Sequence, residues 1–138
     1  MPFQLADFYA RKVEDHLARG QAMSAPPTSL KIRLYRSDDP PTKAGGGTES
    51  AYPGYARVTV TAGAPQWGAS GAPLATQASV TFPAPTGTAG TTYPGVGHIV
   101  VTDQADNWLW LGPLEMERIP TAGTPLVAAA GDLGLAVN

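Results

Sequence analysis

The segment HIVVTDQADNWLWLGPL, residues 98–114, holds side chains whose types could support metal binding or acid–base chemistry. His98 could bind a metal or transfer a proton, and Asp103 and Asp106 could supply oxygen ligands to calcium. A metal site needs several ligands that converge, but the only other histidine, His16, belongs to a different predicted element. The oxygen-ligand spacing of an EF-hand is also missing. We therefore predict no metal site and interpret His98 as a structural residue in a strand.

The same segment has the pattern of a β-hairpin. Asp and Asn favour turns because their short side chains bond to the local backbone, so DQADN predicts a turn between the apolar runs VGHIVVT and NWLWL. Alternate side chains of a strand share a face, which predicts Trp108 and Trp110 on one face and Leu109 and Leu111 on the other. Two aromatic rings on one face can form a sugar-binding platform, a core stripe or a subunit contact. We favour the core or a subunit contact.

Motifs for catalysis give no convincing match. Glu115 and Glu117 share a strand face, and paired carboxylates can support glycoside hydrolysis, but here they do not face each other across a cleft. A solvated edge is the better interpretation. No G-x-S-x-G nucleophile motif is present. The glycines at 45–47 lack the Lys-Ser or Lys-Thr of a P-loop, and GVGHIV at 95–100 leads into a strand, where a dinucleotide motif needs a helix. We predict no catalytic residues and no cofactor.

The charge and hydropathy of the chain argue against nucleic-acid and membrane partners. The formal net charge is −2, and no run approaches the roughly 20 apolar residues of a membrane span. Eight of the nine Lys and Arg residues nevertheless lie at or before Arg57. The densest basic group, Lys31, Arg33, Tyr35 and Arg36, is too small to predict nucleic-acid binding. We interpret the basic excess up to Arg57 as a solvated helix and strand face, or alternatively as a face that docks on an acidic partner.

An amphipathic helix is predicted over residues 3–19, followed by the typical stop residue Gly20. Its apolar stripe recurs at spacings of three and four and consists of Leu5, Phe8, Tyr9, Val13 and Leu17. So short a helix is marginal in water, so the stripe must pack on its own domain or on a neighbouring subunit. We divide the chain into a helical arm at 1–20, a Pro-rich linker at 21–29 and a β-domain at 30–138.

From Leu30 onward the hydrophobic period changes to two, or to continuously apolar runs, as is typical of strands. The predicted strands are 30–36, 55–62, 76–82, 96–102, 107–111, 114–119, 124–130 and 132–138. About eight strands and one helix predict a mainly β fold, a jelly-roll-like antiparallel β-sandwich. The long connections at 38–54, 63–75 and 83–95 carry little predicted order, and loops of this length are often functional or mobile.

The order of these elements resembles that of small virion proteins of tailed bacteriophages. The likeness runs from Leu5 to Val137. It begins with a helix of the type LADFYARKVEDHL, which is followed by the strands in SLKIRLYRSDDPPT, GYARVTVTA and ATQASVTFP. The hairpin comes next, and the segment PLVAAAGDLGLAVN closes the chain. The most suggestive pieces are 54–57, 78–83 and 130–133. Such proteins are described as head decoration (cement) proteins or as tail-fibre-associated proteins. The resemblance implies a jelly-roll-like fold and a structural role in the virion, and it carries over no catalytic residues.

Three hypotheses for function follow. The preferred hypothesis is a decoration protein that is made in the bacterial cytoplasm. It would bind the major capsid protein lattice on the capsid exterior, as a homodimer or homotrimer, and would stabilise that lattice. The second is a tail- or fibre-associated protein that recognises the host surface through its long loops and the aromatics Tyr52, Tyr55, Trp67 and Tyr93. The third is a carbohydrate-binding module or small enzyme built on the paired tryptophans and glutamates. The predicted interface residues are Leu5, Phe8, Tyr9, Val13, Leu17, Trp108 and Trp110.

Overall fold

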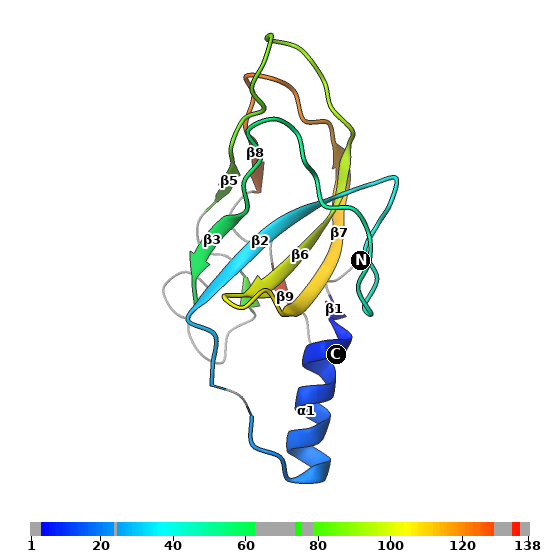
Figure 1. The fold of residues 1–138 in the computed structure, drawn as a ribbon, viewed down its shortest axis with the longest axis vertical. Coiled ribbons are helices and arrows are strands. Elements are labelled where there is room, and N and C mark those ends of the chain that lie inside the picture. Colours follow the sequence, from blue (N-terminus) through cyan, green and yellow to red (C-terminus); the bar gives the residue numbers. More distant parts are fainter. Residues whose placement is uncertain (1–3, 24, 63–73, 76–78, 129–133, 136–138) are drawn as a thin grey trace.

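The computed structural model describes residues 4–23, 25–62, 74–75, 79–128 and 134–135. The described part is mainly β, with one helix near the N-terminus and strands that all pair antiparallel (Figure 1). This confirms the predicted fold class, an antiparallel β-sandwich-like arrangement with a helix near its N-terminus.

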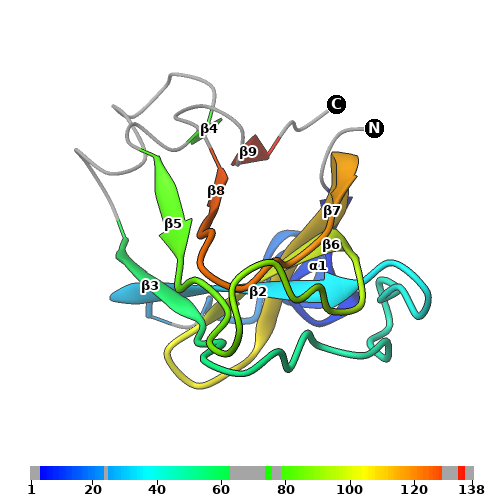
Figure 2. The same cartoon turned by 90° about the horizontal axis from the view of Figure 1, so that it is seen from above.

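The largest layer is a five-stranded sheet of order β1-β7-β6-β2-β3. Its strands are β1 (Gln4–Leu5), β2 (Ser29–Arg36), β3 (Val58–Thr61), β6 (Val96–Asp103) and β7 (Trp108–Arg118). Two short ladders accompany it: β5 (Val80–Phe82) with β8 (Leu126–Ala128), and β4 (Leu74–Ala75) with β9 (Gly134–Leu135). Seen from above, the sheet curves around the side on which β5 and β8 lie (Figure 2). We call residues 29–135, as far as they are described, the β-body.

The main core lies between this inner face of the sheet and the β5–β8 ladder. Alternate residues of β2, beginning with Leu30 and Ile32, point into it, as the period-two pattern predicts. Ile32 pairs with Val101, and Val101 pairs with Trp110, so three neighbouring strands contribute to one layer. Phe82 of β5 packs against this layer and is 1% exposed. The core therefore joins segments that are far apart in the sequence.

The N-terminal segment begins as a strand and not as a helix. Gln4 pairs with Leu111 and Leu5 pairs with Trp110, which makes β1 the edge of the five-stranded sheet. The helix predicted from residue 3 begins only at Asp7. Leu5 therefore belongs to the sheet and not to the helical stripe.

The helix α1 spans Asp7–Arg19. Ala6, the residue before it, is fully buried, and its N–H donates to the carbonyl oxygen of Leu109 at 2.9 Å. Gly20 ends the helix in the left-handed conformation, with φ of 66°, which confirms the predicted stop. None of the residues of α1 is buried, and the helix projects away from the β-body, with its first turn beside β1 (Figure 1).

β7 is a single long strand that passes through Pro113. The sequence predicts two strands there, 107–111 and 114–119, but the strand is continuous, although a proline has no N–H to give to a ladder. Proline is tolerated in a strand that has an open edge. β1 pairs only with Trp110 and Leu111, so no described strand covers that edge of β7 beyond Leu111. Pro113 is therefore compatible with the strand.

Two of the three long connections are ordered by backbone hydrogen bonds. The connection at 38–54 makes such bonds within itself and to β2. The connection at 83–95 is joined to the chain after β7, where the N–H of Tyr93 donates to the carbonyl oxygen of Pro120 at 2.9 Å. The prediction of little order is therefore wrong for these two connections. Most of the third, 63–75, lies outside the described residues.

Candidate interaction surface

The two tryptophans of β7 lie on opposite faces of the sheet. Trp108 pairs with Thr102 and Trp110 pairs with Val101, so Leu109 is an extra residue in a β-bulge. The bulge shifts the alternation by one residue. Trp110 consequently lies in the main core, 6% exposed, whereas Trp108 is half-buried on the outer face, which is turned away from β5. The prediction that they share a face is wrong, and the two rings do not form one platform.

The outer face carries a second, smaller apolar cluster. Its buried members are Ala6, Tyr35, Val100 and Leu111, and Trp108 packs against them. The rings of Tyr35 and Trp108 meet edge to face, with 5.6 Å between their centroids. This geometry is favourable for aromatic pairs and stabilises the Trp108 ring against Tyr35.

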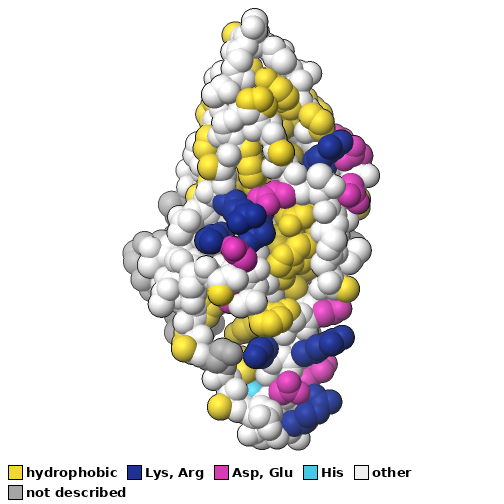
Figure 3. Space-filling model, in the orientation of Figure 1, with side chains coloured by type: hydrophobic (Ala, Val, Ile, Leu, Met, Phe, Trp, Pro, Cys, Tyr) yellow, Lys and Arg dark blue, Asp and Glu magenta, His cyan; other side chains and the backbone are white. Residues whose placement is uncertain are grey.

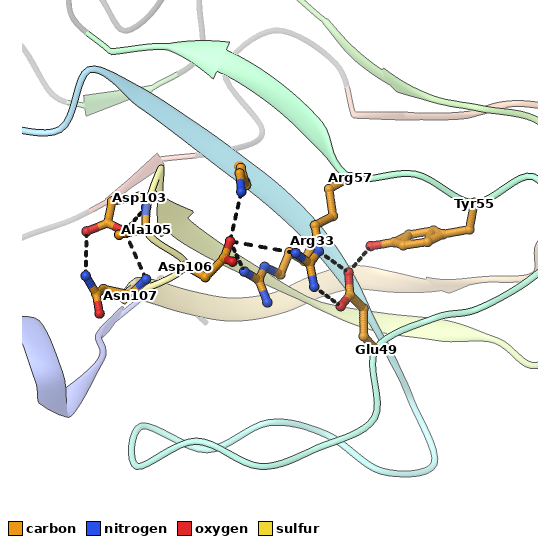
Figure 4. A network of polar contacts seen from close by, with 9 residues as sticks. Arg33, Glu49, Tyr55, Arg57, Asp103, Ala105, Asp106 and Asn107 are labelled. Carbon is orange, nitrogen blue, oxygen red and sulfur yellow. Dashed lines mark hydrogen bonds and ion pairs between the residues drawn. The ribbon is translucent and has the colours of Figure 1, made fainter.

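Beside this cluster, the carboxylate of Asp106 joins three basic side chains (Figure 4). Its Oδ1 accepts hydrogen bonds from Lys31 Nζ at 2.9 Å and from the guanidinium of Arg33 at 2.8 Å, and Arg57 lies 3.7 Å away. The hydrogen bond from Lys31 and the charges of all three cations hold the pKa of Asp106 below its ordinary value. The side chain of Arg33 is only 8% exposed, so Asp106 compensates a nearly buried positive charge.

A second carboxylate, Glu49, extends the network. Arg57 donates two hydrogen bonds to it, each of 3.0 Å, and the hydroxyl of Tyr55 donates a third at 2.7 Å. The Tyr55 oxygen in turn accepts the N–H of Leu34 in β2 at 3.1 Å. Burial alone would raise the pKa of Glu49, but the hydrogen bonds from Arg57 and Tyr55 outweigh it and lower that pKa. Burial, and then the bond to Glu49, raise the pKa of Tyr55.

The predicted basic face is therefore largely neutralised by the chain itself. Figure 3 shows Lys and Arg side chains in the middle of the outer face with Asp and Glu side chains against them. Lys31, Arg33 and Arg57 share two carboxylates, and Arg36 pairs separately with Asp38. This supports an internally compensated, partly solvated face more than a docking site for an acidic partner. The sequence places Asp106 in a turn and gives no sign that it pairs with Arg33, which is 73 residues away.

The segment at residues 98–114 belongs to a β-hairpin, as predicted. β6 and β7 pair on either side of a turn in which Asp103 Oδ1 accepts the N–H groups of Ala105 and Asn107, both at 2.9 Å. Asp106 takes a left-handed φ of 66°, which a short polar residue tolerates. The two aspartates thus have different roles: Asp103 builds the turn and Asp106 holds the cations of β2.

His98 lies in β6 between Tyr35 and Pro113 of the neighbouring strands. Its Nδ1 is buried and has no hydrogen-bond partner in the described structure. Burial lowers the pKa of His98, which keeps the ring neutral at neutral pH. His16 is far from it on α1, where Nδ1 lies 3.0 Å from the carbonyl oxygen of Gln21. The two histidines are not brought together.

Glu117 accepts a hydrogen bond from the hydroxyl of Ser37 at 2.8 Å and lies against Gly95. It therefore binds a neighbouring segment of its own chain. The side chain of Glu115 lies outside the described structure.

Of the aromatic residues in the predicted host-contact set, one is buried and two are half-buried. Tyr52 is 5% exposed, and its hydroxyl donates to the carbonyl oxygen of Pro83 at 2.7 Å. Tyr55 belongs to the network described above, and half-buried Tyr93 donates to the carbonyl oxygen of Thr86 at 2.9 Å. The predicted host contact is therefore wrong for Tyr52, whose ring is buried. Trp67 lies outside the described residues.

The predicted helical interface separates into two groups. Leu5 and Tyr9 are partly buried against the main core. Phe8 is 44% exposed and Leu17 is 78% exposed, while Val13 is half-buried and is not among the residues packed on the core. The last three are the members of the stripe available to a partner.

A groove of about 280 Å³ separates the first turn of α1 from the hairpin turn. Phe8, Lys43, Asp106 and Trp108 are among its lining residues. A second hollow, of about 390 Å³, continues along α1 past Phe8 and Arg11. Accessible surface on this side therefore runs from the outer face onto the helix.

Within the described ranges, no three His, Asp or Glu side chains are grouped so that they could hold a metal ion. The helix found in those ranges is not long and apolar enough to cross a membrane.

Glu49 gives a pH-dependent prediction. Its pKa is lowered in the folded state, so its contribution to stability is present above its ordinary pKa of 4.5 and is lost as the pH falls through the folded value. We expect Glu49→Gln to lower the free energy of unfolding by about 1 kcal/mol at pH 7, since Arg57 is partly solvated, and the gap to wild type to narrow below pH 4.5. Urea unfolding at a series of pH values measures this gap. Parallel stability curves for the two proteins would contradict the assignment.

A β-sandwich-like body, a projecting helix and a polar face closed by its own ion pairs define a small module of the mainly β class. Comparison with protein families is more specific. The family described as "Podophage GP4 fiber I protein gp80" matches residues 4–136, and the chain belongs to this family. It is therefore a structural protein of a bacteriophage virion, as the sequence resemblance predicts at that level. No curated protein is detectably similar to the chain.

Proposed function

We propose that this protein is a fibre-associated structural protein of the phage tail, which acts in or beside the fibres that meet the host surface. The observation that carries the proposal is the match to a fibre protein family over residues 4–136, nearly the whole chain. The role is structural, without enzymatic activity and without nucleic-acid or membrane partners.

The family supports this role better than the decoration of capsids, which is the preferred hypothesis from the sequence. A rigid β-body with an exposed helix suits either role, because both require many copies to make modest contacts that add up on a symmetric particle. The family name favours the fibre-associated role over the decoration role. No repeat at a fixed period is present in the sequence, so we propose a globular component beside the fibre shaft.

The structure also changes which residues would contact a host. Tyr52 is buried, and the hydroxyls of Tyr52 and Tyr55 are both bonded to other parts of the β-body. Phe8 and Trp108, on either side of the groove, are accessible instead. We propose that any contact with the host surface involves this side of the molecule.

A co-sedimentation titration tests the location. Purified protein is mixed separately with heads and with tails from particles that lack it. We expect saturable binding to tails and none to heads. Saturable binding to heads, near an integer ratio to capsid subunits, would overturn the proposal in favour of a decoration protein. A further measurement, inhibition of phage adsorption by the purified protein, separates host recognition from a purely structural role within the fibre.

A further inference from the structure

The groove between α1 and the hairpin turn contains polar atoms that the described chain leaves unused. Asp106 Oδ2 and Asn107 Oδ1 accept no hydrogen bond within the described residues. The carboxamide nitrogen of Asn107 donates one hydrogen bond, to Asp103 at 3.1 Å, and has a second hydrogen to give. The groove therefore offers acceptors and a donor side by side. A ligand rich in hydroxyl groups suits such a set, because a hydroxyl both donates and accepts.

Two aromatic side chains, Phe8 and Trp108, line the same groove. Trp108 is half-buried and packs edge to face on Tyr35, whereas Phe8 is 44% exposed. Figure 3 shows exposed hydrophobic side chains between the ion pairs of the outer face and the charged side chains of α1. The C–H groups of a sugar ring carry a weak positive charge and pack on the negative face of an aromatic ring. Aromatic rings beside hydroxyl-binding groups therefore favour a saccharide.

The charges of the groove and of the adjoining hollow along α1 favour an anionic ligand. Three basic side chains line them without an ion pair in the described chain, namely Arg11, Lys12 and Lys43. The lining carboxylates Asp15 and Asp106 already pair with basic side chains from outside the two sites. Of the described lining carboxylates, Asp7 alone is unpaired, so three free cations stand against one free carboxylate. This excess attracts a negatively charged ligand.

We propose that the groove binds an acidic saccharide, a chain of sugar units that carry carboxylate groups. One sugar ring packs on Phe8 and Trp108, and its hydroxyls bond to Asn107. Its carboxylate pairs with Lys43, and the next unit lies in the adjoining hollow beside Arg11. The volumes, about 280 Å³ and 390 Å³, match the lower end of the range for small-molecule sites. The inference names the ligand of the side proposed to meet the host, and in that respect it rests on the proposed function.

Other anionic ligands fit the groove less well. The charged groups of an acidic peptide or a nucleic acid offer acceptor atoms, which would leave the acceptors Asp106 Oδ2 and Asn107 Oδ1 without donors. A nucleic acid also needs many cations along its length, whereas the formal net charge of this chain is −2. An acidic saccharide brings one charge and several hydroxyl donors in each unit. It therefore satisfies both the cations and the acceptors.

Isothermal titration calorimetry of the full chain tests the ligand class. The probes are two uronic acid chains, tetragalacturonate and tetramannuronate, and we expect saturable binding of at least one, weakening as salt is added. Neutral cellotetraose and the non-sugar polyanion tetraglutamate are the controls, and each should bind at least about tenfold more weakly. Binding of neither uronate would overturn the proposal. Equal binding of cellotetraose would show that charge is not recognised, and equal binding of tetraglutamate that the sugar is not, so either result would also overturn it.

Two substitutions test the location of the site. Lys43→Gln should weaken uronate binding by about tenfold, and Phe8→Ala by about fivefold. The matched control is Arg118→Gln, which removes an exposed charge of β7 that lines neither site and should change binding less than about twofold. Circular dichroism checks that each variant is folded. Equal losses in the two charge variants, or wild-type binding by both groove variants, would show that the groove is not the site.

The calorimetry and the co-sedimentation titration can fail separately. Protein that sediments with tails but binds no uronate would leave the fibre-associated role in place and overturn the saccharide site. Protein that binds uronates through Lys43 but sediments with heads would support the site and overturn the proposed location.

Discussion

Replacing Phe82 with alanine is expected to lower the free energy of unfolding by about 3–5 kcal/mol. The side chain is 1% exposed and packs on the sheet from a strand of only three residues, β5. Its removal leaves a cavity between the two layers, and β5 has few other contacts with which to close it. Urea unfolding followed by tryptophan fluorescence measures the loss, and Trp110 in the same core reports on it.

Two controls separate cavity formation from a general effect of losing an aromatic ring. Phe82→Leu keeps most of the volume and should cost less than about 1.5 kcal/mol. Phe8→Ala removes a ring that is 44% exposed, and its cost should be below about 1 kcal/mol. A similar loss in Phe82→Ala and Phe8→Ala would show that the β5–β8 ladder does not form the second layer of the core.

Replacing Gly47 with alanine is expected to cost about 2–4 kcal/mol, although a single methyl group is added at an exposed loop position. The backbone there has φ of 79°, which strains any residue with a Cβ. The added Cβ would also lie 2.7 Å from the backbone nitrogen of Pro41, which cannot move aside as a flexible side chain could. Strain and overlap act together at this position.

Gly46 is the matched control for that prediction. Its φ is 80°, nearly the same as that of Gly47, but no atom lies within 4 Å of the position that its Cβ would take. Gly46→Ala should therefore show the strain alone, about 1–2 kcal/mol. Equal losses of thermal stability in the two variants would mean that residues 40–47 do not pack in the way described.

The parts of the fold that could be predicted are those that are determined by local sequence patterns. The alternation from Leu30 to Leu34 identified β2 because one side of that strand is buried and the other is partly solvated. The hairpin was predictable because Asp103 bonds to its own turn, within four residues. Gly20 stops α1 through its own backbone conformation. In each case the residues that determine the element are close in the sequence to the residues that form it.

The parts that were missed depend on distant segments or on one-residue irregularities. β1 is two residues long and has no period to detect, and it exists because β7 offers it an edge. The bulge at Leu109 moves Trp108 to the other face, and simple alternation gives no sign of it. Asp106 reaches Arg33 only after the whole sheet has formed. The position of Trp108 and the ion pairs of Asp106 on the protein surface therefore depend on the tertiary structure.

The attachment of α1 has a mechanical consequence. The helix is not a free tail, because β1 and Ala6 fix its first end to β7, and the chain after Gly20 returns to β2 in the same sheet. A tensile load applied to α1 in a virion would therefore divide between two attachment points on one rigid layer. Detaching the helix requires peeling β1 from β7 and, independently, straining β2, which is flanked by β6 and β3 and is held on both edges. Such a doubly attached projection can transmit force to the β-body without being pulled out of it.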